Sequence, residues 1–206
     1  MRTVDHAVDL MKGGFMKLKI SLLALFAVLF TVSGCFFAPW EDCEYDSLGD
    51  TPKSHYEALE SLTGWGRPLE NFSMDGVIYS VMIQGTGYYP RRKGPYTVWV
   101  MTAAIGDRKR SGPDRILTLD RVCVSQGDES VYETTGILLT LKGWGIHREK
   151  FILSGKWKVV LPNVLNPKGG QFVRVRMEVS SETGESKTFV FDFRPKVTSG
   201  YFQCAG

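Results

Sequence analysis

The sequence predicts an all-β protein: an antiparallel β-sandwich of immunoglobulin-like or similar type, with one short accessory helix near its N-terminus. From residue 74 onward, at least seven short apolar and β-branched runs follow one another. Several alternate apolar and polar residues, which is typical of a sheet with one covered and one wet face. Clusters of Gly, Pro, Asn, Asp and Ser separate the runs, as turns require. No repeating strand–helix alternation appears, which disfavours an open parallel sheet.

A short helix is expected at residues 51–62, ahead of the strands. Thr51 is a suitable N-cap, Pro52 suits the first helical position, and Gly64 is placed to end the helix. The apolar residues recur every three positions and predict a narrow stripe that docks on the β domain. That stripe consists of Tyr56, Leu59 and Leu62.

The expected strands are seven runs of five to ten residues that are rich in apolar or β-branched side chains. They lie at 77–83, 96–105, 115–124, 136–141, 156–161, 172–179 and 189–193. Alternation is clearest at 172–179, where Val and Met point one way and Arg174, Arg176 and Glu178 the other. The connection at 166–170, Asn-Pro-Lys-Gly-Gly, is a good turn signal. We find no domain boundary and no fixed-period repeat after residue 74.

The N-terminal region carries a targeting signal. Residues 20–32 contain no charge, and this run is too short for a spanning helix, which needs about 20 apolar residues. Lys17 and Lys19 precede it, and the tripeptide Ser33-Gly34-Cys35 follows it. A basic start, a short apolar core and small residues at the end are typical of a secretory signal peptide.

The residues Val32-Ser33-Gly34-Cys35 resemble the lipobox of bacterial lipoproteins. The resemblance covers about the first 35 residues only. It implies cleavage before Cys35, a diacylglycerol on the sulfur of that residue and acylation of its amine. Inner-membrane lipoproteins of this class carry an aspartate at the position of Phe36. The phenylalanine here therefore implies localisation to the outer membrane of a bacterial envelope.

This resemblance sets the expected domain organisation. Residues 1–34 are a signal peptide, whose translation starts at Met16 unless residues 1–15 are a tolerated extension. Residues 35–50 are expected to be a lipidated tether with an acidic, solvated run, and residues 51–206 a single β-sandwich domain. The formal charge of +3 comes largely from the signal peptide, so net charge indicates no nucleic-acid partner.

Three cysteines remain after the lipidated one, and an oxidising envelope permits a disulfide between two of them. Cys43 and Cys204 lie near the two ends of the mature chain and are the preferred pair, with the other pairings open. Cys123 lies in an expected strand and reads as a small buried residue. No C-x-x-C or histidine pair accompanies the cysteines, so we expect no metal and no cofactor.

Two Gly-Trp-Gly triplets, centred on Trp65 and Trp144, are candidate contact sites. Flanking glycines can leave an indole exposed, and an exposed indole stacks on sugar rings or on a partner protein. The alternative, which we favour from the sequence, is that the glycines bend the chain and fold each Trp back onto the core.

Two basic triplets in expected loops are candidate contacts for phosphate or carboxylate groups, which arginine binds in a bidentate manner. The alternative is that they are simply solvated loop charge. The arginines concerned are Arg91, Arg92, Arg108 and Arg110.

Catalytic signatures are missing from the sequence. It contains neither a G-x-S-x-G elbow nor an H-E-x-x-H motif. His147 falls in a polar loop and is expected to face solvent; a hydrolase built around it is a minor alternative that requires a serine or an acid to converge on it. The sequence therefore predicts a non-enzymatic, lipid-anchored envelope protein that binds a partner protein, as an accessory of secretion or surface assembly or as an immunity or inhibitor protein. A carbohydrate-binding module that uses Trp65 or Trp144 is the second hypothesis.

Overall fold

A computed structural model describes residues 38–87, 92–106, 115–162, 164–181 and 184–202. The chain divides into two compact units, residues 41–199 and the chain ends 1–40 with 200–206. Strands take up 68% of the described residues. The fold described below is that of the first unit.

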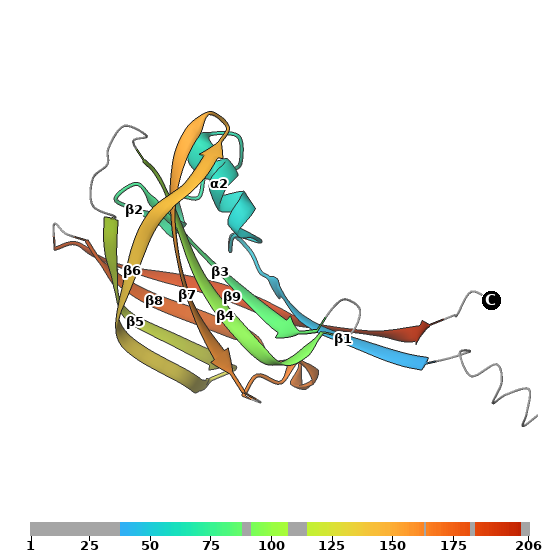
Figure 1. Cartoon of the computed structure of the whole chain (residues 1–206). Coiled ribbons are helices and arrows are strands. Elements are labelled where there is room, and N and C mark those ends of the chain that lie inside the picture. Colours follow the sequence, from blue (N-terminus) through green and yellow to red (C-terminus); the bar gives the residue numbers. More distant parts are fainter. Residues whose placement is uncertain (1–37, 88–91, 107–114, 163, 182–183, 203–206) are drawn as a thin grey trace, which may run out of the picture. The chain divides into compact units, whose positions relative to one another are not determined.

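The strands form one antiparallel sheet in the order β1-β9-β8-β5-β6-β7-β4-β3-β2 (Figure 1). The elements in chain order are β1 (Ala38–Ser47), α2 (His55–Thr63), the 3-10 turn η1 (Glu70–Phe72), β2 (Ser73–Met74), β3 (Val77–Thr86), β4 (Lys93–Ile105), β5 (Arg115–Gln126), β6 (Glu129–His147), β7 (Lys150–Leu161), the 3-10 turn η2 (Pro167–Gly169), β8 (Val173–Ser180) and β9 (Ser186–Phe202). The prediction of a mostly antiparallel β protein with one short helix is confirmed.

A long strand, β6, joins the two halves of the sheet. Its first part pairs with β5 up to Leu141, and its last part pairs with β7 from Lys142 onward. Because one strand serves both halves, the sheet is continuous and curls on itself as a half-barrel (Figure 1). The finer prediction of a two-sheet sandwich is therefore not confirmed.

The core fills the inside of the curl. Tyr79 of β3 stacks on Phe189 of β9 with ring centroids 4.7 Å apart, so the two ends of the sheet meet face to face. Phe191 of β9 packs 5.1 Å from Phe72 of η1. The predicted alternation of β8 is confirmed, because its Val and Met residues are buried while the side chains between them reach the outer face. Burial of these aromatic and branched side chains is the main force that holds the curl.

Helix α2 covers part of the outer face of the sheet. Leu59 packs on Ala103 of β4 and Ile152 of β7, and all three are buried. The predicted C-terminus at Gly64 is confirmed, with that residue in the left-handed conformation at φ 82°. The predicted cap at Thr51 is wrong: Ser54 caps the helix, and its hydroxyl accepts a hydrogen bond from the backbone N–H of Glu57.

The predicted apolar stripe of α2 is only partly correct. Leu59 is buried and Leu62 partly buried, but Tyr56 is 57% exposed. Ala58 is fully buried and takes the place of Tyr56 against the sheet. A short helix on a flat sheet buries a narrow strip of residues, and the large Tyr side chain at the edge of that strip turns outward.

The segment expected to be a solvated acidic tether includes a strand. Residues 38–47 form β1, at the edge of the sheet next to β9. Asp42 is fully buried, because Arg92 surrounds its carboxylate: the guanidinium donates from Nε at 3.1 Å and Nη2 at 2.6 Å, and the backbone N–H donates at 2.8 Å. A carboxylate with three such donors can lie inside a protein. Arg92 is thus a structural residue and not solvated loop charge.

Candidate binding site

A groove of about 400 Å³ opens where β6 leaves β5 and joins β7. It is built from four elements: the first residue of α2, the outer face of β4, and the facing stretches of β6 and β7. The described residues that line it are His55, Met101, Thr140, Lys142, Gly143, Trp144, Ser154, Gly155 and Lys156. In Figure 1, α2 and the β6–β7 hairpin lie together at one end of this unit.

A β-bulge places Trp144 at the groove. Gly143 pairs with Leu153 and Gly145 pairs with Ile152, so Trp144 is the extra residue between two pairs. A bulge turns a side chain away from the regular alternation of the strand. Both glycines are required, because a Cβ on Gly143 would lie 2.9 Å from the Phe151 ring and Gly145 has φ 151°.

Trp144 is consequently 56% exposed, and Trp65 is 69% exposed. The interpretation that flanking glycines fold each indole onto the core is wrong for both residues. In the first triplet, Gly64 ends α2 and the backbone N–H groups of Trp65 and Gly66 both donate to the Glu60 carbonyl. This turn directs the chain away from the sheet, so the indole of Trp65 stays at the surface.

The groove is basic. None of the described residues that line it is acidic, while Lys142 and Lys156 contribute two ammonium groups and Thr140 and Ser154 two hydroxyls. The lysines lie on two neighbouring paired strands, Lys142 on β6 and Lys156 on β7. Beside them Trp144 supplies an aromatic face. Such a lining is suited to a ligand that carries negative charge next to a ring.

His55 closes the groove from the helix side. Its Nε2 lies 3.4 Å from the Ser154 hydroxyl, and its ring meets the Trp144 ring edge to face with centroids 6.5 Å apart. Its Nδ1 is buried without a hydrogen-bond partner among the described residues. Burial lowers the pKa of His55, so the ring is neutral at pH 7.

A second cluster ties the β6–β7 hairpin to α2. Glu60 Oε1 lies 3.1 Å from His147 Nε2 and 3.4 Å from the Arg148 guanidinium. The Arg148 guanidinium in turn lies 4.8 Å above the Trp65 ring. A hydrogen bond from Tyr56 is the main cause that lowers the pKa of Glu60, and Arg148 and His147 add to it. Three groups therefore hold this carboxylate ionised.

His147 was expected to face solvent, and this expectation is wrong: its side chain is only 14% exposed. The acid that a hydrolase would require is present in Glu60. This contact meets the requirement for a converging acid, so the hydrolase alternative stays a prediction; the Ser154 hydroxyl contacts the other imidazole, His55. The contacts among Glu60, His147 and Arg148 join α2 to the β6–β7 hairpin, and we call these three residues the clasp.

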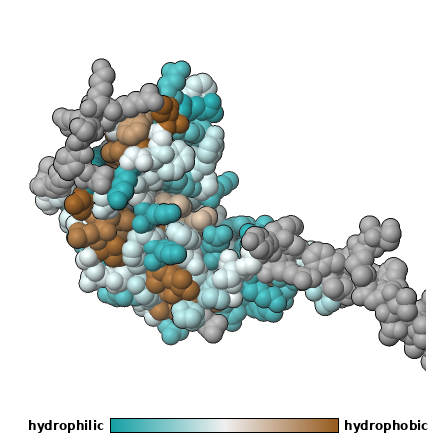
Figure 2. All heavy atoms as spheres, viewed as in Figure 1, coloured by the Kyte–Doolittle hydropathy of each residue, from teal (hydrophilic) through white to brown (hydrophobic). Residues whose placement is uncertain are grey.

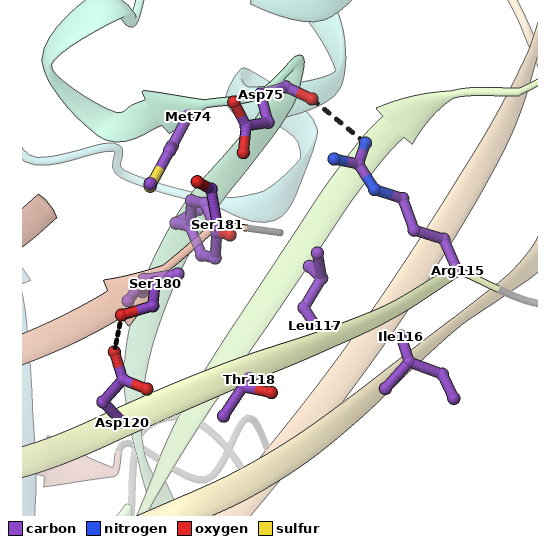
Figure 3. A pocket seen from close by; sticks show the side chains of 11 residues that line it. Met74, Asp75, Arg115, Ile116, Leu117, Thr118, Asp120, Ser180 and Ser181 are labelled. Carbon is purple, nitrogen blue, oxygen red and sulfur yellow. Dashed lines mark hydrogen bonds between the residues drawn. The ribbon is translucent and has the colours of Figure 1, made fainter. Parts of the chain in front are cut away.

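A smaller pocket of about 240 Å³ lies between the β2–β3 turn, β5 and the end of β8 (Figure 3). Its polar groups are used within the protein. Arg115 donates to the Asp75 carbonyl at 3.0 Å, and the Ser180 hydroxyl donates to Asp120 at 2.6 Å, as Figure 3 shows. Tyr79 forms part of the lining, and burial raises its pKa to about 12. With these donors already paired, this pocket is a weaker candidate than the groove.

The remaining predicted residues are placed as follows. Cys43 is buried and Cys123 half-buried, and they form no disulfide with each other. The partner expected for Cys43 lies outside the described residues, so that disulfide stays a prediction. That partner is Cys204, and also outside the described residues are the lipidation site Cys35 and three of the four arginines, namely Arg91, Arg108 and Arg110.

His55 and Glu60 carry no local sequence signal that identifies them as site residues. Their partners lie far along the chain, 99 residues away for His55 and 87 for Glu60. A local signal existed only for the cap: Ser54 followed three residues later by Glu57 is a capping-box pattern. That pattern fixes where α2 starts, and hence that His55 is its first residue and faces the groove.

On the face shown in Figure 2, the apolar residues of the described chain lie in separate patches. Among the described residues, no three His, Cys, Asp or Glu side chains are grouped to hold a metal ion. The described part of the chain contains no helix with the length and apolarity needed to cross a membrane. Comparison with protein-family models, curated proteins and solved structures finds no match.

Proposed function

We propose that the chain is a lipid-anchored, non-enzymatic binding protein of a bacterial envelope that acts through contacts with another envelope protein. The observation that carries this proposal is the exposure of Trp65 beside Arg148, where α2 meets the β6–β7 hairpin. Trp, Tyr and Arg are the residues that most often dominate the binding energy of protein interfaces. Tyr56, which is 57% exposed on the same helix, adds to this contact surface.

The clasp beneath this surface favours binding. Glu60 fixes Arg148, and Arg148 lies against Trp65, so these side chains have lost part of their freedom before a partner arrives. Binding then costs less conformational entropy. The Trp65, Arg148 and Tyr56 side chains form what we call the contact surface.

A photo-crosslinking amino acid at position 65 tests this proposal in the full lipidated protein within its native envelope. We expect one dominant protein adduct, identified by mass spectrometry. The matched control is the same crosslinker at Phe172, which is 55% exposed but lies at the β8 end of the molecule. Arg148→Ala should reduce the adduct at position 65. Identical adducts from both positions, or none at position 65, would contradict the proposal.

The anchor is tested separately. We expect Cys35→Ser to abolish incorporation of labelled fatty acid and to release the protein from the outer-membrane fraction. Fatty-acid labelling that persists in this variant would exclude Cys35 as the attachment site. N-terminal sequencing of the unprocessed Cys35→Ser precursor would show whether translation starts at Met1 or Met16.

Carbohydrate binding is the second candidate function, and the exposure of Trp144 next to a polar groove favours it. An indole face stacks on a sugar ring, and hydroxyl and ammonium groups of the groove donate to its oxygens. Trp144→Ala should abolish binding to a glycan array without unfolding the domain. Trp65→Ala is the control, because Trp65 does not line the groove. Unchanged sugar binding in Trp144→Ala would remove this candidate.

A further inference from the structure

We propose that the groove at the junction of β6 and β7 binds a sugar that carries a carboxylate or phosphate group, with Lys142 and Lys156 on the acidic group and Trp144 on the ring. This inference rests on the second candidate function, carbohydrate binding, and names its ligand class. It is independent of the protein contact surface around Trp65.

The charge of the lining selects an anion. Two lysines approach the groove from different strands, and the described lining holds no carboxylate to neutralise them. By contrast, two lysines elsewhere on this unit are paired with a carboxylate: Lys168 lies 2.8 Å from Glu41, and Lys196 lies 3.0 Å from Glu44. An ammonium pair without a carboxylate in the same cavity favours a negatively charged ligand.

The shape of the site selects a ring. The bulge at Trp144 exposes the indole at the groove, while Gly143 and Gly155 leave the adjacent wall without side chains. A Cβ on Gly155 would lie 3.0 Å from the buried Thr102 hydroxyl and 3.1 Å from the Thr140 carbonyl, so a side chain at this position would crowd the interior of the protein. A volume of about 400 Å³ is in the range of small-ligand sites and accommodates one or two sugar units.

A polar anchor lies at the helix side of the groove. The buried Nδ1 of His55 has no partner among the described residues, although its Nε2 contacts Ser154. Buried polar atoms are almost always hydrogen-bonded, and the exceptions gather at sites that hold a water or a ligand. Because this nitrogen is enclosed, a buried water is the partner it can take, and the imidazole borders the groove through its ring and its Nε2 contact with Ser154.

Calorimetric titration of the full-length chain in detergent tests the inference. The probes are a uronic acid tetrasaccharide, glucose 6-phosphate, a glucose tetrasaccharide, sodium acetate and inorganic phosphate. We expect either acidic sugar to bind at least about tenfold more tightly than the neutral one, because one charge-assisted hydrogen bond raises the affinity by about that factor. The tighter of the two acidic sugars identifies whether carboxylate or phosphate is the natural group.

Two variants and a matched control locate the site. Lys142→Met and Lys156→Met should each weaken binding of the acidic sugar about tenfold. Lys158→Met should leave it unchanged: it lies two residues along β7 on the same face and, like Lys156, over the Trp99 ring, but outside the groove. Equal losses in Lys156→Met and Lys158→Met would overturn the assignment.

The other outcomes separate this inference from the function on which it rests. If the neutral and acidic tetrasaccharides bind equally tightly and Trp144→Ala loses both, the preference for an acidic group is overturned. Carbohydrate binding then still stands. If acetate or phosphate binds as tightly as the sugars, the sugar is rejected as the ligand. The groove is then a site for small anions. Absence of heat with all five probes overturns both the inference and carbohydrate binding.

Discussion

Glu60 of α2 and His147 of the β6–β7 hairpin meet at 3.1 Å, and both side chains are only 14% exposed. This contact joins a helix near the start of the domain to a hairpin 87 residues later in the chain. Arg148, the next residue of the hairpin, shares the same carboxylate and lies over Trp65. The orientation of the contact surface therefore depends on one glutamate.

Replacement of Glu60 tests this dependence. In Glu60→Gln the carboxylate charge is lost, so the hydrogen bonds from Tyr56, His147 and Arg148 weaken together. We expect faster amide hydrogen exchange in the β6–β7 hairpin and in the last turn of α2, with little change in β8. Crosslinking from position 65 should fall as well.

The control for this variant is Glu149→Gln, one residue past Arg148 in the hairpin turn, where the side chain is exposed. It removes the same charge from the hairpin without touching the clasp. Equal hydrogen exchange in Glu60→Gln and the unmodified protein would show that the clasp does not hold the hairpin.

Much of the fold was predictable because its signals are local. The alternation of β8 lies within eight consecutive residues, and the left-handed cap at Gly64 follows from a single glycine. Strand β1 was missed because its sequence is rich in acids, which reads as solvated chain. Asp42 is buried only because Arg92, fifty residues later, supplies three donors, and no local pattern contains that partner.

The candidate site was predictable only in part for the same reason. The two Gly-Trp-Gly triplets identify both tryptophans as candidate contacts, but the orientation favoured from the sequence, an indole folded back onto the core, is the wrong one. The orientation of the Trp144 side chain is set by the bulge, where the pairing of β6 with β7 skips this residue. Likewise, a histidine and a serine 99 residues apart meet only because α2 packs across the sheet beside β7.

The pair of Asp42 and Arg92 predicts a strong effect on stability. Asp42→Asn keeps the size of the side chain but removes the charge that holds the guanidinium. We expect a loss of about 2 kcal/mol in the free energy of unfolding, below the ~3–5 kcal/mol of a fully buried pair because Arg92 keeps 27% of its side chain exposed. Urea denaturation followed by Trp fluorescence measures it.

The same pair predicts acid sensitivity. The hydrogen bonds from Arg92 lower the pKa of Asp42 in the folded state below its ordinary value of 3.8. Its contribution to stability is therefore complete above that ordinary pKa and is lost as the pH falls through the lower, folded value. Asp42→Asn should flatten the acid limb of the stability curve. If the acid limb is equally steep in the variant, other carboxylates and not Asp42 cause the loss of stability at low pH.

The bulge predicts which glycine substitutions are tolerated. Gly145→Ala forces a side chain onto a backbone with φ 151° and should cost about 1–2 kcal/mol of unfolding free energy. Gly169→Ala is the control, since the nearest atom to its added Cβ lies 3.6 Å away, and it should stay within about 0.5 kcal/mol of the unmodified protein. Equal stability of the two variants would mean that the bulge relaxes without strain.

His55 predicts a second pH effect, at a milder pH. Burial lowers the pKa of its imidazole below the ordinary value of 6.5, so the folded protein resists protonation of a ring that the unfolded chain protonates readily. Stability from this residue is complete above pH 6.5 and declines as the pH falls from there through the lower, folded pKa. Thermal unfolding at pH 7.5 and pH 5 should therefore show a smaller pH-dependent loss of Tm in His55→Gln than in the unmodified protein. His147→Gln is the control, because it removes the neighbouring imidazole, which contacts Glu60 and does not line the groove. If the loss of Tm between the two pH values is the same in His55→Gln as in the unmodified protein, then the imidazole at the groove is solvated rather than buried.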